Sequence, residues 1–125
     1  MAKLRHIALI VPDPDKAAKF FEEAFDMKVA GRARRGVYVS DGIINVALLK
    51  QEGNEKVGLY HFGMWVDDLD AAEKKVVDAG GKYLAGRPTS PKSFYEAKYQ
   101  SPTGLVFDLT HTGWAGAVKD VVPQK

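Results

Sequence analysis

The chain repeats itself, and this repeat constrains its fold more than any other feature of the sequence. Residues 4–32 align without gaps with residues 59–87. A repeat of this length is one supersecondary unit, too small to bury its own hydrophobic face. We therefore expect two similar units that pack on each other or on the units of another chain. The identical pairs are Leu4/Leu59, His6/His61, Val11/Val66, Asp13/Asp68, Asp15/Asp70, Ala17/Ala72, Lys19/Lys74, Ala24/Ala79, Ala30/Ala85, Gly31/Gly86 and Arg32/Arg87.

Both units have the same predicted order of elements. Each begins with a short apolar segment typical of a strand, followed by a turn and a helix. Apolar residues recur at helical spacing in the first helix, and Asp70 with Glu73 predicts the start of the second. The sequence therefore predicts an α+β fold of two βαβββ modules. The expected strands are 4–11, 27–31, 36–40 and 43–50 in the first module, and 59–66, 82–85, 94–100 and 105–111 in the second.

The length of 125 residues fits a single domain. Within it we expect module one at 4–50, a polar linker at 51–58, module two at 59–111 and a C-terminal tail at 112–125. The tail carries Trp114 and is expected to pack against the modules.

Composition excludes several classes of function. The net charge of +2 is close to balanced and gives no argument for nucleic acid or a membrane as a partner. Cysteine is absent, which excludes disulfides, thiolate metal sites and cysteine nucleophiles. The N-terminus runs directly into a strand pattern, without the apolar segment of a signal peptide, so we expect a cytoplasmic protein.

Two of the three histidines occupy the same position in the two repeats. A pseudo-two-fold relation between the modules would bring His6 and His61 towards one point. A single histidine on a strand is most simply a half-buried residue bonded to the backbone, but packing alone rarely fixes the same histidine twice. Asp108 lies in an otherwise apolar strand, where a carboxylate is costly unless it is paired, binds a cation or faces water at an edge. Two imidazoles and one carboxylate suit a divalent metal (Fe2+, Mn2+, Ni2+ or Zn2+) with open coordination positions.

These residues lie in segments that resemble the vicinal oxygen chelate superfamily, which includes glyoxalase I, methylmalonyl-CoA epimerase, extradiol dioxygenases, fosfomycin-resistance thiol transferases and bleomycin-resistance proteins. The resemblance covers about residues 4–111. It implies a curved mixed sheet around a metal-site cavity, with His6, His61 and Asp108 as the ligands. The matching segments are Leu-Arg-His-Ile-Ala-Leu-Ile-Val at 4–11 with Asp13, the Phe20-Phe21 helix, Tyr-His-Phe-Gly at 60–63 and Ser-Pro-Thr-Gly-Leu-Val-Phe-Asp at 101–108.

The chain departs from the family pattern at three positions. Asp108 stands where glutamate is usual. Ala47 stands where glyoxalase I and the epimerase carry a fourth ligand that also serves as a base, so both of those chemistries are disfavoured. Ala8 replaces a threonine of the fosfomycin enzymes, although Tyr38 matches their pocket tyrosine.

Further pocket residues follow from the alternation of side chains along strands. Tyr38, Asn45, Trp65 and Thr110 are the predicted substrate-binding residues. Lys98 and Glu96 share one face of their strand, and if it points inwards they are the candidate catalytic residues, acting in anion binding or proton transfer. The alternative is a solvent-facing pair on an edge strand.

The leading hypothesis is a metal-dependent enzyme whose small substrate chelates the metal through adjacent oxygens. The lack of a fourth ligand favours a dioxygenase over a glyoxalase-like lyase or isomerase, or a thiol transferase. The other alternative is a metal-free protein that binds small molecules, as in the bleomycin-resistance branch. The resemblance also implies a homodimer, in which we expect His6 from one chain to meet His61 and Asp108 of the other.

Overall fold

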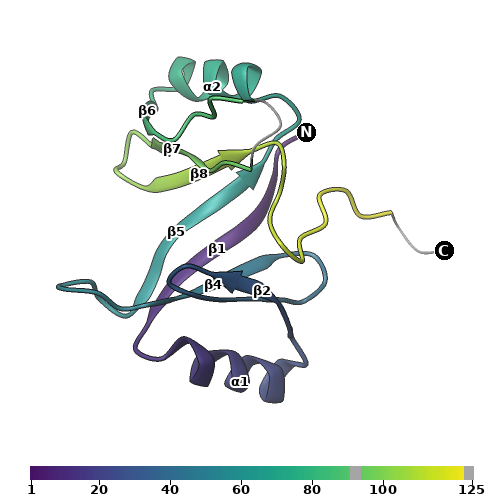
Figure 1. Ribbon diagram of the computed structural model, residues 1–125. Helices are drawn as coiled ribbons and strands as arrows, with labels where there is room; N and C mark the ends of the chain where they lie inside the picture. Colours follow the sequence, from purple (N-terminus) through teal and green to yellow (C-terminus); the bar gives the residue numbers. More distant parts are fainter. Residues whose placement is uncertain (91–93, 123–125) are drawn as a thin grey trace.

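The computed structural model describes residues 1–90 and 94–122, in which one eight-stranded sheet carries two helices (Figure 1). The predicted α+β fold with two βαβββ modules is confirmed. The elements are β1 (Lys3–Val11), α1 (Pro14–Phe25), β2 (Lys28–Ala33), β3 (Gly36–Ser40), β4 (Asn45–Lys50), β5 (Gly58–Trp65), α2 (Leu69–Asp78), β6 (Lys82–Ala85), β7 (Ala97–Gln100) and β8 (Val106–Thr110). Neither helix is long and apolar enough to cross a bilayer, a statement that covers the described residues only.

The strand order repeats the symmetry of the sequence. It runs β2-β3-β4-β1 in module one and continues β5-β8-β7-β6 in module two. In each half the first strand pairs in parallel with the last strand of its own module. The two halves meet where β1 and β5 pair in antiparallel fashion, so a single chain closes the sheet between its own modules.

Each helix is capped by the same aspartate of the repeat. The side chain of Asp13 accepts a hydrogen bond from the backbone N–H of Lys16, and that of Asp68 accepts one from Ala71. An aspartate that bonds the N–H three residues on satisfies one of the unpaired donors at a helix start. The predicted cap at Asp70 is therefore wrong, because Asp70 lies within the first turn and its carboxylate pairs with Arg87.

Each module has its own apolar core on the side of the sheet that its helix covers. Val37, Val39 and Leu48 form the core of module one with Ala18 of α1. In module two, Tyr99, Phe107 and Leu109 are among the buried core residues. The helices lie at opposite ends of the molecule, with β1 and β5 between them (Figure 1). The other face of the sheet is therefore not needed for the cores and is available for polar groups.

Strand β4 begins at Asn45, two residues later than predicted. The Asp41 carboxylate accepts hydrogen bonds from the backbone N–H groups of Ile43 and Ile44, which holds both residues in the turn. Strand β7 covers only residues 97–100 of the predicted 94–100, and part of the preceding loop (residues 91–93) lies outside the described residues.

Candidate metal centre

One row of side chains crosses the middle of the sheet and builds the site. Residues that face each other on neighbouring strands project to the same side of the sheet. The β1–β4 and β1–β5 registers place His6 between Asn45 and Gly63. The row continues through Asp108 on β8 to Lys98 on β7. His61 belongs to the adjacent row, opposite Ala8.

The three predicted ligands come together within one chain. Their candidate ligand atoms lie within 4.8 Å of one another. The Nε2 atoms of His6 and His61 are 3.4 Å apart, and Oδ2 of Asp108 is 3.0 Å from Nε2 of His61. In this structure β1 and β5 of the same chain pair directly, so His6 comes from the same chain as the other two, whereas a partner chain was expected to supply it.

His6 is oriented by Asn45. Nδ1 of His6 lies 2.7 Å from Oδ1 of Asn45, while Nδ2 of Asn45 donates to the carbonyl of Ala115. An amide oxygen accepts only, so Nδ1 of His6 carries the proton and Nε2 presents its lone pair to the centre. Burial lowers the pKa of His6 below its usual value, which keeps the imidazole neutral and able to ligate a metal.

Asp108 has no exposed surface and offers one free oxygen. Oδ1 accepts a hydrogen bond of 2.8 Å from Nζ of Lys98. Oδ2 lies 3.0 Å from Nε2 of His61 as an ion-pair contact but has no hydrogen-bond partner among the described residues. Burial alone would raise the pKa of Asp108, but His61 and Lys98 outweigh it and hold that pKa below its usual value. A buried carboxylate oxygen without a donor is costly unless a cation completes it.

Two of the separations between the ligand atoms fit a single ion. Nitrogen and oxygen atoms bound to one metal at about 2.0–2.2 Å lie roughly 3.0–3.4 Å from each other. The observed separations of 3.4 Å between the two Nε2 atoms and 3.0 Å between His61 and Asp108 agree with this spacing. Two imidazole nitrogens and an unpaired carboxylate oxygen are also the donor types that first-row divalent metals take.

Module one contributes no carboxylate at the position that corresponds to Asp108. Asp108 faces Gly63 across β5–β8, and the repeat relates Gly63 to Ala8. Ala8 in turn faces Ala47, which is therefore the counterpart of Asp108 and cannot ligate. The same rows make Tyr38, opposite Ala47, the counterpart of Lys98.

The structure brings both candidate catalytic residues to the centre. Lys98 reaches Asp108 as described above. Oε1 of Glu96 lies 3.9 Å from Nε2 of His6 and accepts a hydrogen bond of 2.7 Å from the indole of Trp114. The predicted alternative, a solvent-facing Glu/Lys pair, does not describe these contacts.

The four predicted substrate-binding residues differ in whether their polar atoms are already hydrogen-bonded within the protein. Tyr38 is half-buried, and burial together with the charge of Glu96 raises the pKa of its hydroxyl. Asn45 already uses both polar atoms within the protein. The hydroxyl of Thr110 pairs with that of Thr112, and the Trp65 indole donates to the carbonyl of His111.

Trp114 has a role at the centre that was not predicted from the sequence. Its indole stacks on the His6 ring, with a centroid distance of 4.7 Å and an interplanar angle of 7°. Gly63 makes room for it, because a Cβ at that position would lie 2.6 Å from the Trp114 ring. A glycine within a strand often marks such a close approach, so Gly63 was the available signal.

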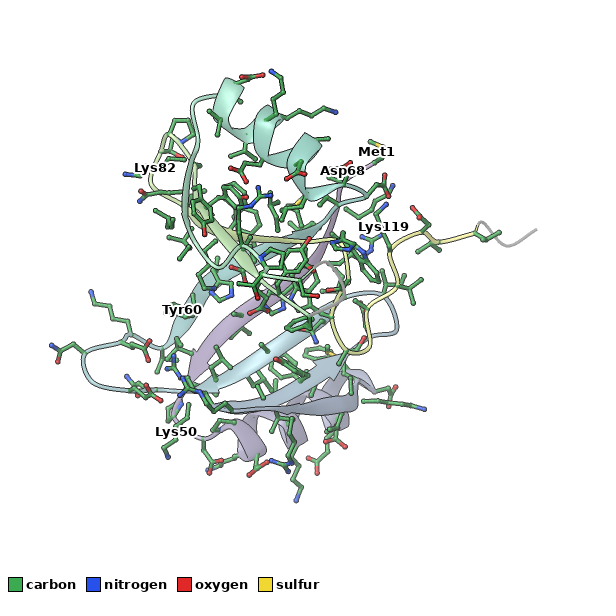
Figure 2. The ribbon with its side chains drawn as sticks, turned by 45° about the horizontal axis from the view of Figure 1, so that its top comes forward. Met1, Lys50, Tyr60, Asp68, Lys82 and Lys119 are labelled. Atoms are coloured by element: carbon green, nitrogen blue, oxygen red, sulfur yellow. The ribbon has the colours of Figure 1, made fainter. Side chains whose placement is uncertain are left out.

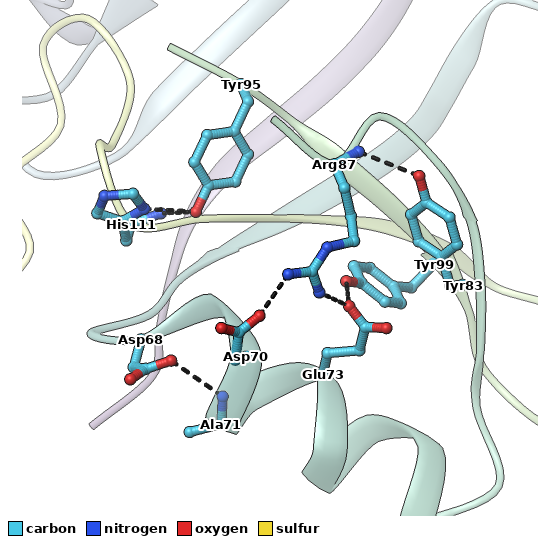
Figure 3. A network of polar contacts seen from close by, with 9 residues as sticks. All are labelled: Asp68, Asp70, Ala71, Glu73, Tyr83, Arg87, Tyr95, Tyr99 and His111. Atoms are coloured by element: carbon cyan, nitrogen blue, oxygen red, sulfur yellow. Dashed lines mark hydrogen bonds and ion pairs between the residues drawn. The ribbon is translucent and has the colours of Figure 1, made fainter. Parts of the chain in front are cut away.

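A second polar network lies between α2 and the sheet (Figure 3). Arg87 pairs there with Asp70 and Glu73, and Glu73 also accepts a hydrogen bond from Tyr99. The third histidine, His111, contacts the Tyr95 hydroxyl. These contacts tie α2 and the following loop to the sheet.

Comparison with known proteins agrees with the geometry. The model of the Glyoxalase/Bleomycin resistance protein/Dioxygenase superfamily matches residues 3–109. Metallothiol transferase FosB of Bacillus licheniformis is 28% identical over 116 residues, which cover 88% of this chain and 75% of that protein.

Solved structures share the fold at low identity. Methylmalonyl-CoA epimerase from Mycobacterium tuberculosis has a TM-score of 0.67 and 16% identity, with 85% of each chain covered. The 2,3-dioxygenase LapB from Pseudomonas sp. KL28 has a TM-score of 0.68 and 17% identity, over 92% of this chain and 42% of that one. With the match of the family model over most of its length, the chain belongs to the Glyoxalase/Bleomycin resistance protein/Dioxygenase superfamily.

Proposed function

We propose that the protein is a divalent-metal-dependent enzyme that acts on a small substrate with two adjacent oxygens. The observation that carries the proposal is the convergence of three atoms that can bind a metal, namely the Nε2 atoms of His6 and His61 and Oδ2 of Asp108, of which Oδ2 has no hydrogen-bond partner. In a protein interior such groups are normally satisfied. A relative that is named as a metallothiol transferase adds support for a bound metal.

The residues around the ligands have distinct roles in this proposal. Lys98 occupies Oδ1 of Asp108, which leaves Oδ2 as the single carboxylate donor. Asn45 holds His6 in the tautomer whose Nε2 is free. Ala47 leaves the side towards module one without a protein ligand, so this is where a chelating substrate would bind the metal.

For the reaction class, we favour an oxygen-dependent ring or bond cleavage. Two histidines and one carboxylate with open positions are the ligand set of non-haem Fe(II) oxygenases. When bound, such an ion brings dioxygen and a chelated substrate together and polarises the substrate oxygens. Glu96 and Lys98 are the groups on this chain that are near enough to take up or return a proton.

A second candidate is metal-assisted proton transfer without oxygen, and the position of Glu96 favours it. Its carboxylate lies 3.9 Å from Nε2 of His6, in a site where Ala47 supplies no base. Because the base of glyoxalase I is missing at position 47, we expect negligible isomerisation of the methylglyoxal–glutathione hemithioacetal with any metal.

Metal analysis tests the proposal first. We expect one divalent ion per chain, and loss of most of it in His6→Ala, His61→Ala and Asp108→Ala with the fold intact by circular dichroism. Full occupancy in the His6→Ala/His61→Ala double variant would contradict the proposed centre. With Fe(II) loaded, oxygen uptake with a series of catechols then distinguishes the favoured class from proton transfer, which is read as deuterium exchange at a carbon next to a carbonyl.

A further inference from the structure

The candidate metal centre is closed by the segment after β8. We call residues 112–119 the strap. His6 is 2% exposed and Asp108 has no exposed surface, so neither can be reached from solvent in this arrangement. Trp114 of the strap, itself only 6% exposed, is the side chain that lies flat on His6.

Hydrogen bonds from module one hold the strap in place. Its backbone carbonyls accept from Nδ2 of Asn45 at Ala115, from the Ser40 hydroxyl at Gly116 and from Arg5 at Val118. The strap thus leaves module two and crosses to module one, as the course of the chain after β8 shows in Figure 1.

The far end of the strap is anchored by an ion pair. Lys119 pairs with Asp67 and donates to the carbonyl of Met1, and these groups gather near the start of α2 (Figure 2). The same contacts raise the pKa of Lys119 and lower that of Asp67 to about 2, so the pair stays charged over the physiological range.

The strap is coupled to a metal ligand. Asn45 holds Nδ1 of His6 with its oxygen and the strap carbonyl of Ala115 with its nitrogen. Trp114 contacts the same His6 ring from its face and donates to Glu96. Displacement of the strap therefore removes a partner from His6, Asn45 and Glu96 at once.

The strap has the local character of a movable segment. It contains no helix or strand, and it is attached by hydrogen bonds, the Lys119–Asp67 ion pair and one aromatic stack. Gly113 and Gly116 flank Trp114 with φ of 77° and 80°, in the left-handed region where glycine is favoured. Segments held by few buried contacts open at low free-energy cost.

We propose that the strap is a gate over the metal centre. In its closed form Trp114 covers the face of His6 and separates the ligands from solvent. In its open form, reached by rotation at Gly113 and Gly116, the indole leaves and a substrate can take its place against His6. The role of the gate rests on the proposed metal centre, but its opening can be measured with or without metal.

A reversible cross-link tests the gate directly. An ideal Cβ on Gly31 of β2 lies 3.7 Å from Cβ of Ala115, within the 3.5–4.5 Å range of disulfides. Gly31 does not have a positive φ, and the chain has no cysteine of its own. In the Gly31→Cys/Ala115→Cys double variant, oxidation should therefore form a single bond that locks the strap to module one, and reductant should release it.

Two readouts compare the oxidised and reduced forms of this variant. In a Trp65→Phe background Trp114 is the sole tryptophan, and acrylamide quenching reports its exposure without any metal. We also expect transfer of Mn2+ or Co2+ to excess EDTA to be about tenfold slower in the oxidised form. Equal quenching and equal release in the two forms would overturn the gate. If no metal binds, the proposed function is wrong. The quenching of Trp114 in the two forms then tests by itself whether the strap opens. Oxidised Gly31→Cys is the matched control.

Removal of the cover gives an independent check. Trp114→Ala should accelerate metal release at least about tenfold, because opening no longer precedes it. Trp114→Phe retains a ring on His6 without the bond to Glu96 and should fall between Trp114→Ala and the unmodified protein. Val122→Ala, an exposed position of the same tail beyond the strap, should leave release unchanged. Release from Trp114→Ala at the unmodified rate contradicts the proposal.

Discussion

At the scale of single residues, His6 shows how little freedom a predicted ligand retains. Its ring has Asn45 at Nδ1 and Trp114 on one face, and only Nε2 is directed at the centre. A ligand that is already oriented loses little conformational entropy when the metal binds, and residues that orient ligands matter nearly as much as the ligands do.

Asn45 provides a test of this orientation. We expect Asn45→Ala to lower the affinity for Zn2+ or Mn2+ by about 10–100-fold in calorimetric titrations, because the His6 ring loses the acceptor that fixes its tautomer. Asn45→Asp retains an oxygen at that position and should bind metal more tightly than Asn45→Ala. Equal affinities for the alanine variant and the unmodified protein would show that Asn45 does not orient His6.

At the scale of elements, Gly63 on β5 leaves the space in which Trp114 of the strap packs. A Cβ on Gly63 would lie 2.6 Å from the Trp114 ring and 3.0 Å from Cβ of His6. Overpacking of this kind typically costs about 1–3 kcal/mol. We therefore expect Gly63→Ala to lower the free energy of unfolding in urea by this amount.

The matched variant of the same prediction is Gly63→Ala/Trp114→Ala. With the indole gone, the added methyl group keeps only its 3.0 Å contact with Cβ of His6, so the double variant should be more stable than the sum of the two single losses predicts. Strictly additive losses would mean that Trp114 does not lie on Gly63.

The elements themselves were largely predictable, and the exceptions have identifiable causes. The repeat predicted the order of strands and helices because both modules use the same local patterns. The helix cap was placed at Asp70 because Glu73 completes a capping-box pattern. In the structure Glu73 instead accepts from Tyr99 and Arg87, which approach from distant segments. A local pattern cannot anticipate such partners.

Of the candidate site, the repeat predicted the pair His6 and His61, and the apolar strand around Asp108 predicted the carboxylate. The position of Trp114 could not be predicted, because the strap has no periodicity and is held by long-range hydrogen bonds to Ser40 and Asn45. The sequence also could not predict whether the site is built within one chain or shared between two. The same residues of β1 and β5 pair in both arrangements.

At the scale of the whole molecule, one chain supplies every ligand of the candidate centre. We therefore expect a metal content of one ion per chain at dilutions where sedimentation shows a monomer. Loss of metal on dilution, in step with dissociation of a dimer, would show instead that the modules pair between chains in solution.

The folded chain also responds to pH as a whole. Burial lowers the pKa of His6 in the folded state below its unfolded value of about 6.5. Between these two values the unfolded chain binds a proton that the folded chain does not, so the free energy of unfolding increases with pH.

We therefore expect the metal-free protein to become less stable as the pH falls below about 6.5, as read from urea midpoints between pH 7.5 and 5. The loss ends once the pH is below the folded pKa. His6→Gln should reduce this slope. An equal slope in the variant would show that another group is responsible.

Ala47 and Asp108 occupy equivalent positions in the two modules, so only one module supplies a negative charge to the centre. Two neutral imidazoles and one carboxylate leave a divalent cation with one uncompensated positive charge, and Lys98 and Glu96 offset each other. A buried net charge is unfavourable unless a counter-ion joins it. The centre should therefore prefer a chelator that binds as a monoanion, such as acetohydroxamate, over a neutral one.

Ala47→Glu supplies the missing charge internally. It should therefore tighten metal binding and weaken the binding of acetohydroxamate in the same titration. Unchanged acetohydroxamate affinity in Ala47→Glu would show that charge does not select the ligand.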